Sequence, residues 1–166
     1  MNAPTAYHQL GRFIVAFQHL ESSVNDLLEL LADTTDCEAV RILANDLEYR
    51  KRLNTADVLF ARFIDLRNNT DALAKSEFHK LIVELGDLGD RRNDLVHSHY
   101  NAWLNIHGNE GLLRRNSKLR GNKGEREEKE EELQPDAFNQ DLQRLSAASA
   151  RLEAFRLRVI NWLYPE

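Results

Sequence analysis

The chain has 166 residues, of which 42% are hydrophobic and 30% are charged, and its formal net charge at pH 7 is -5. This length and composition predict one folded domain and exclude an intrinsically disordered chain. The acidic balance excludes a protein that coats nucleic acid by bulk charge, although it leaves room for a local basic patch.

The cysteine and histidine content limits the chemistry that one chain can perform. Cys37 is the only cysteine, which excludes an intramolecular disulfide and a thiolate zinc site. The six histidines show no metal-ligand spacing supported by a carboxylate motif, which argues against a metal enzyme, although His97 and His99 could bind a metal by chance. We expect no cofactor. We expect a cytoplasmic protein, because no Lys or Arg precedes Arg12 as in a signal peptide and no apolar run approaches a membrane span.

Hydrophobic residues recur at alternating steps of three and four in four long stretches, which predicts four amphipathic helices. The predicted helices run from Leu10 to Leu31, from about Leu47 to Leu66, from near Asp71 to His97, and from Pro135 toward the C-terminus. A shorter helix from Cys37 to about Ala44 is predicted after the N-capping side chains of residues 33–36.

The periodicity changes between the last two long helices. Residues 100–106 are rich in aromatic and apolar side chains, 107–111 have a turn composition, and Leu112 resumes an apolar run, which predicts a β-hairpin. Basic residues then dominate up to Lys123. Glutamates dominate residues 125–132. The glycine and charge content of residues 121–132 predicts a solvated linker.

These elements together predict an all-α fold, an up-and-down bundle of four long helices plus a short one with a small β-hairpin before the last helix. We expect a single domain over residues 1–166, in which residues 99–134 form an inserted hairpin and charged linker.

Arg92 occupies a position in the helix that starts near Asp71 where packing would favour a leucine. At about 100° per residue its side chain points within roughly 20° of the centre of the apolar stripe. A charge removed from water costs several kcal/mol unless it is paired, so this guanidinium needs a buried partner or an opening in the bundle. Two structural explanations stay open beside a functional one: Arg92 snorkels from a fraying helix end, or it pairs with Glu21.

A second stripe of the same helix carries Asn93 and His97, each within roughly 20° of Gly86. Gly86 and Gly89 are each unfavourable by roughly 1 kcal/mol relative to alanine in a helix interior. They therefore indicate close approach by another backbone or a ligand, or alternatively a kink or break. His97 lies near the helix end, and an imidazole suits proton transfer near neutral pH.

The end of this helix resembles a known family signature in six residues, Arg92-Asn93-Asp94-Leu95-Val96-His97. The family is HEPN (higher eukaryotes and prokaryotes nucleotide-binding), in which an arginine, usually followed by a polar residue, precedes a histidine by four to six positions. The long, heptad-patterned N-terminal helix also fits. The resemblance implies a helical bundle and, as in many members, a metal-independent endoribonuclease of toxin or defence type, in which two motifs meet at one composite site of a homodimer.

The resemblance also implies residue roles. His97 would act as base on a ribose 2′-hydroxyl or as acid to the leaving oxygen, Arg92 would stabilise the phosphorane, and Asn93 would orient His97 or contact phosphate. Arg92 and His97 are about 140° apart on an ideal helix, which favours a site shared by two chains. Some family toxins are silenced by a nucleotidyltransferase that modifies a tyrosine two residues after the histidine. Here that position is His99, with Tyr100 one place later, which argues against this modification. An antitoxin or a nucleotidyltransferase partner is expected only from the resemblance.

Basic and aromatic residues after the motif are candidates for RNA binding by charge and stacking. They are Arg114, Arg115, Lys118 and Arg120, beside Tyr100 and Trp103. The alternative is a solvated hairpin whose aromatic side chains pack on the bundle. Two other functions also stay open: a HEPN-like module without catalysis that binds nucleotide, RNA or a protein, and a plain helical dimerisation protein in which Arg92 is structural.

Overall fold

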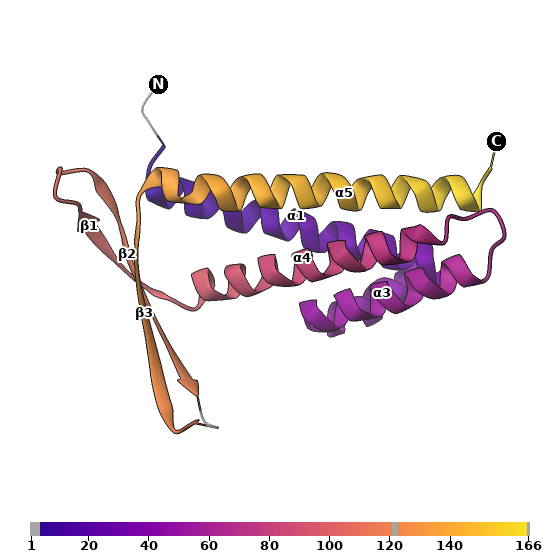
Figure 1. The fold of residues 1–166 in the computed structure, drawn as a ribbon, viewed down its shortest axis with the longest axis horizontal. Helices are drawn as coiled ribbons and strands as arrows, with labels where there is room; N and C mark the ends of the chain where they lie inside the picture. The colour runs from indigo at the N-terminus through magenta and orange to yellow at the C-terminus, as the bar shows by residue number, and fades with distance from the viewer. Residues whose placement is uncertain (1–3, 121–122, 166) are drawn as a thin grey trace.

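The computed structural model describes residues 4–120 and 123–165, with the backbone alone at Leu119 and Arg120. Within these residues it is mostly helical, and a three-stranded sheet lies at one end of the helices (Figure 1). The helices are α1 (Ala6–Ala32), α2 (Cys37–Asp46), α3 (Tyr49–Asp65), α4 (Leu73–Val96) and α5 (Asn139–Leu163), with a short 3₁₀ helix, η2 (Pro135–Phe138), directly before α5. The strands are β1 (His99–Leu104), β2 (Glu110–Arg120) and β3 (Glu125–Leu133).

The five helices that the sequence predicts are all present. Figure 1 shows α4 running antiparallel to α3, and α5 antiparallel to α4. Arg41 of α2 pairs with Glu29 of α1 at 2.8 Å, and Arg67 just after α3 pairs with Asp33 just after α1 at 3.3 Å. The second contact joins the C-terminal ends of α1 and α3, so these two helices run in the same direction and α2 is the return between them.

The predicted apolar seams form one core shared by the long helices. At its centre Phe60 of α3 stacks on Phe78 of α4 with ring centroids 4.1 Å apart, and Phe155 of α5 meets both rings edge-on. Leu66 departs from the prediction, because α3 ends at Asp65 and Leu66 is 62% exposed. A hydrophobic residue past the last helical turn no longer follows the helical period, and it loses its place on the buried face.

The sheet is larger than the predicted hairpin. β1 and β2 pair antiparallel with His99 opposite Arg115, which confirms the hairpin. The prediction of a solvated linker is wrong for residues 125–132, because they belong to β3, which pairs antiparallel with β2. Residues 121–122 of that prediction lie outside the described residues. The fold is therefore helical with a three-stranded antiparallel sheet rather than all-α with a hairpin.

Opposite charges explain why this polar segment forms a strand. The register of β2 and β3 places Arg114 opposite Glu131 and Arg115 opposite Glu130. Arg115 Nε lies 2.9 Å from a carboxylate oxygen of Glu130, and Arg114 Nη2 lies 2.8 Å from one of Glu131. Facing pairs of opposite charge each stabilise antiparallel strands by roughly 0.2–1 kcal/mol.

An ionic cluster joins the sheet to the helices. Arg91 of α4 donates from Nε to Asp141 of α5 at 2.8 Å and from both terminal nitrogens to Glu131 of β3 at 3.0 and 3.1 Å. Arg114 of β2 shares Glu131 and also donates to the carbonyl oxygen of Asp94 at 3.1 Å. Because the cluster spans α4, α5, β2 and β3, it holds the sheet against the last turns of α4, which contain residues 92–96.

Candidate functional site

Two glycines of α4 let the start of α3 approach closely. A Cβ added to Gly86 would lie 2.9 Å from Nη1 of Arg50, and one added to Gly89 would lie 2.6 Å from Cε1 of Tyr49. The Tyr49 hydroxyl donates to the carbonyl oxygen of Leu85 at 3.1 Å. A close approach is therefore present at both glycines, but the neighbours are side chains of α3 and not the backbone or ligand that the sequence predicted. The alternative of a helix break is wrong, because α4 continues through both glycines.

A cavity of about 380 Å³ lies beside these glycines, between α1, α3 and α4. Its walls combine arginines, carboxylates, an amide and a tyrosine: Glu21, Glu48, Tyr49, Arg50, Arg52, Gly86, Gly89, Asp90, Arg92 and Asn93. Arg50 pairs with Asp90 at 2.8 Å, and Arg52 pairs with Glu21 at 3.3 Å. Two of the three arginines are thus neutralised by carboxylates of the cavity itself.

Arg92 is the third of these arginines, and it is half-buried. Its Nη1 donates to the side-chain oxygen of Asn93 at 3.0 Å, and its guanidinium carbon lies 5.6 Å from the ring centroid of Phe17. Within residues 4–120 and 123–165 it makes no salt bridge. The structural alternative of an ion pair with Glu21 is wrong, because Glu21 pairs with Arg52. Arg92 is accommodated by an opening and by the face of an aromatic ring, an interaction worth roughly 0.5–2 kcal/mol.

His97 lies apart from this cavity. α4 ends at Val96, and His97 is the C-cap, with its backbone N–H donating to the carbonyl oxygen of Asn93 at 3.0 Å. Its side chain is exposed and does not line the cavity that Arg92 and Asn93 share. One chain therefore brings Arg92 and Asn93 together in the cavity and leaves His97 outside it. This agrees with the angle of about 140° that separates Arg92 and His97 on an ideal helix.

Tyr49 is a member of the cavity that sequence reasoning missed. Burial raises the pKa of its hydroxyl above the ordinary value, so the group remains neutral and donates its hydrogen bond to Leu85. Arg50 and Arg52, on the same turn of α3, also went unnoticed. No local pattern marks these three residues, because only the packing of α3 on α4 makes them line the cavity.

The predicted RNA-binding basic residues are mostly engaged within the chain. Arg114 is 3% exposed and pairs with Glu131, so its guanidinium offers no free surface to RNA. Arg115 is exposed on the opposite face of the sheet and pairs with Glu130. Lys118 Nζ lies 2.5 Å from a carboxylate oxygen of Asp94. The side chain of Arg120 lies outside the described residues.

The two aromatic residues of that prediction differ in exposure. Tyr100 packs against the core, and its hydroxyl donates to the carbonyl oxygen of Leu95 at 2.6 Å. Burial raises the pKa of this hydroxyl. Trp103 is 37% exposed on the hairpin. For Tyr100 the structure thus shows packing on the helices, the alternative that the sequence left open.

The cluster around Glu131 also escaped sequence reasoning, although one signal could have revealed part of it. The basic stretch that includes Arg114 is followed directly by the acidic stretch that includes Glu131, which is the order expected of two complementary antiparallel strands. The contact of Arg91 with Asp141 spans 50 positions of the chain and has no comparable local signal.

Among the described residues no group of three or more His, Cys, Asp and Glu side chains could hold a metal ion. In the same part of the chain, no helix combines the length and the apolar character that crossing a bilayer requires. Comparisons of this chain with protein-family models, with curated proteins and with solved structures found no match.

Proposed function

We propose that this protein is a cytoplasmic, metal-independent endoribonuclease of the toxin or defence type, with a site shared by the two chains of a homodimer. The observation that carries the proposal is the state of Arg92. Its guanidinium lines an open cavity beside the amide of Asn93, and no carboxylate of the described residues pairs with it. A guanidinium in such a place binds a phosphate through two charge-assisted hydrogen bonds.

The proposed reaction uses the three residues of the motif. Arg92 and Asn93 of one chain hold the scissile phosphate, and the exposed His97 of the second chain takes the proton of the ribose 2′-hydroxyl as its oxygen attacks phosphorus. The bond to the 5′-oxygen breaks, and that oxygen receives a proton from the imidazolium form of His97. Arg92 stabilises the charge that develops on the phosphorane. The products are a 2′,3′-cyclic phosphate and a 5′-hydroxyl.

The test is incubation of the purified protein with RNA in EDTA, followed by analysis of the RNA ends. Cleavage that leaves 2′,3′-cyclic phosphate is expected, and Arg92→Ala and His97→Ala should each lower its rate by roughly 10²–10³-fold. His99→Ala is the matched control, because His99 is also exposed and lies two residues away. Cleavage at the wild-type rate by His97→Ala refutes the proposed chemistry.

A non-catalytic module that binds nucleotide, RNA or a protein is the second candidate. The separation of His97 from the cavity favours it, because an arginine and an asparagine can bind an anion without a proton-transfer group beside them. RNA binding that Arg92→Ala weakens, without any cleavage, would identify this function. If RNA neither binds nor is cleaved and Arg92→Leu raises thermal stability, Arg92 is purely structural.

The proposed toxin or defence role carries an expectation about partners. A paired antitoxin or a nucleotidyltransferase remains a prediction that rests on the family resemblance. Tyr100, the first tyrosine after the motif along the chain, has its hydroxyl engaged with the carbonyl oxygen of Leu95. An antitoxin that acts by another contact would have to cover Arg92 or His97.

A further inference from the structure

The strand β1 leaves half of its backbone hydrogen-bonding groups without a partner strand. The order of the sheet is β1-β2-β3, so β1 is an edge strand. Just beyond β1, Asn105 donates its N–H to the carbonyl oxygen of Asn109 at 3.0 Å. Bonded pairs alternate along an antiparallel ladder, so Tyr100, Ala102 and Leu104 direct their N–H and C=O groups away from β2. No backbone hydrogen bond within the described residues reaches this outer edge.

The two edges of the sheet differ in how they are protected. β3 has six glutamates, one arginine and one lysine among its nine residues, and such charges oppose pairing with another strand. β1 contains no Asp, Glu, Lys or Arg in its sequence HYNAWL. Charge therefore protects the β3 edge against association and leaves the β1 edge open to it.

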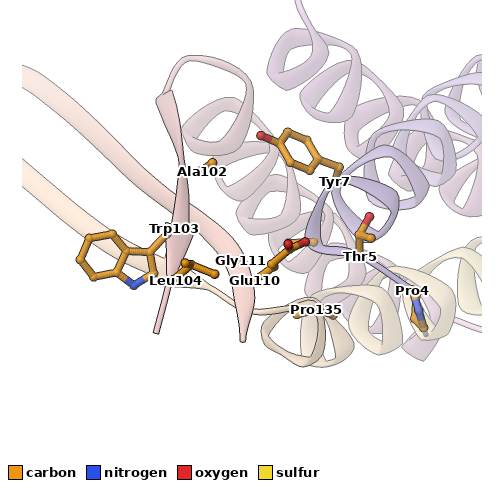
Figure 2. Close-up of a pocket in the computed structure, with 10 residues that line it drawn as sticks. Pro4, Thr5, Tyr7, Ala102, Trp103, Leu104, Glu110, Gly111 and Pro135 are labelled. Atoms are coloured by element: carbon orange, nitrogen blue, oxygen red, sulfur yellow. The ribbon is translucent and has the colours of Figure 1, made fainter. Parts of the chain in front are cut away.

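The residues next to the open edge are apolar and accessible. Leu104 is 63% exposed and Ile106 is 95% exposed. A cavity of about 560 Å³ adjoins β1 and is lined by Ala102 and Leu104 on the sheet and by Tyr7 at the start of α1 (Figure 2). A strand added at this edge would cover apolar surface as well as satisfy backbone groups.

The outward-facing groups of β1 are self-complementary. Tyr100, Ala102 and Leu104 are spaced evenly about Ala102, so two antiparallel copies can place Ala102 opposite its own mate and Tyr100 opposite Leu104. In this register all outward N–H and C=O groups of these three residues find partners. Ala102, with its small side chain, stands on the symmetry axis, where a bulky residue would meet its own copy. Because neither copy brings a charge to the contact, no repulsion opposes it.

We propose that β1 is the docking edge for a second copy of this chain, in an isologous contact whose two-fold axis passes beside Ala102. The contact joins two three-stranded sheets into one continuous antiparallel sheet. A two-fold contact of this kind is closed in itself, because it occupies the exposed edge of both copies and leaves no edge for a third.

This contact goes beyond the proposed ribonuclease and is separate from its composite site. His99 lies three residues from Ala102, and at about 3.3 Å per residue the two copies of His99 stand roughly 20 Å apart across the axis. At this separation the β1 contact does not bring His97 of one copy to a phosphate held by Arg92 and Asn93 of the other. The contact that would form the composite site is therefore a separate one, between the helical parts of two chains.

The experiment replaces the residue on the axis with charges of either sign. Ala102→Glu and Ala102→Lys, measured separately by light scattering after size exclusion, should each show half the molar mass of the wild-type assembly, because like charges meet at the axis. An equimolar mixture of the two variants should regain the wild-type mass, since opposite charges then meet. Ser146→Glu adds the same charge at an exposed position of α5 and should leave the mass unchanged.

The molar masses of the wild type and of the Ala102 variants decide whether β1 forms the contact. A monomeric wild-type protein, or an Ala102→Glu variant that keeps the wild-type mass, overturns the proposal. Variants that lose mass but fail to associate when mixed overturn the register centred on Ala102. Circular dichroism spectra equal to that of the wild type verify the folding of each variant. RNA cleavage is measured in parallel to separate the two proposals. A His97→Ala variant that loses RNA cleavage but keeps the wild-type molar mass bears on the proposed function and not on the β1 contact.

Discussion

Replacing Glu131 by glutamine tests whether the ionic cluster stabilises the junction between sheet and helices. Glutamine keeps the shape of the side chain and removes the charge that Arg91 and Arg114 share. Only 4% of the Arg114 side chain and 20% of the Arg91 side chain are exposed, so both cations would lose a carboxylate while remaining largely out of water. The cluster therefore predicts a loss of stability well above that of a surface ion pair.

The expected loss follows from burial. Removing one partner of a fully buried pair costs about 3–5 kcal/mol, and the 34% exposure of Glu131 allows solvent to screen part of this. We expect Glu131→Gln to lower the free energy of unfolding at pH 7 by about 2–3 kcal/mol, which corresponds to roughly 5–10 °C in Tm for a chain of this size. The measurement is urea unfolding followed by circular dichroism.

The pH dependence of this difference gives a second test. Burial disfavours the ionised Glu131, but the hydrogen bonds from Arg91 and the charges of Arg91 and Arg114 outweigh burial and hold the pKa of Glu131 below its ordinary value. Because the pKa is lower in the folded than in the unfolded state, the stabilisation is complete above the unfolded-state pKa of about 4.3 and is lost as the pH falls through the folded-state pKa. The difference between wild type and Glu131→Gln should therefore shrink in that acid range.

Glu132→Gln is the matched control, because Glu132 is the next residue of β3 and is exposed. It should change the free energy of unfolding by less than about 0.5 kcal/mol. Equal stability of Glu131→Gln and the wild type at pH 7 would refute the reasoning. A difference between them that stays constant into the acid range would show that the carboxylate charge is not its source.

Two further substitutions examine the helices. Gly89→Ala puts a Cβ 2.6 Å from a ring carbon of Tyr49, so it should lower the free energy of unfolding in urea titrations by about 1–3 kcal/mol. Gly11→Ala adds a Cβ with nothing within 4 Å, so it should raise the free energy of unfolding by up to about 1 kcal/mol. Effects of the same sign would contradict the packing argument. Asp36→Ala removes the carboxylate that accepts a hydrogen bond from the backbone N–H of Ala39 at 3.0 Å. It should lower the free energy of unfolding by about 1 kcal/mol. An unchanged thermal unfolding curve would show that this N-cap does not stabilise α2.

The position of Arg92 shows what the helical periodicity of a sequence can predict and what it cannot. The helical period puts this residue in line with Leu88 and Leu95, and the structure has both leucines buried and Arg92 half-buried between them. Periodicity therefore identified the conflict between charge and position. It could not show the solution, because the cavity that receives the guanidinium is built by α1 and α3, and Phe17, the ring beneath it, lies 75 positions away in the chain.

The sequence by itself determined the helices, because each one is defined by the spacing of its own apolar residues and by local caps such as Asp36. It also determined the motif at the end of α4. Only the tertiary structure decided that residues 125–132 form a strand and that Arg114 is buried, because both depend on charges that meet across two strands. A strand with polar side chains on both faces shows no hydrophobic alternation, and its stability comes from partners that are distant in the chain.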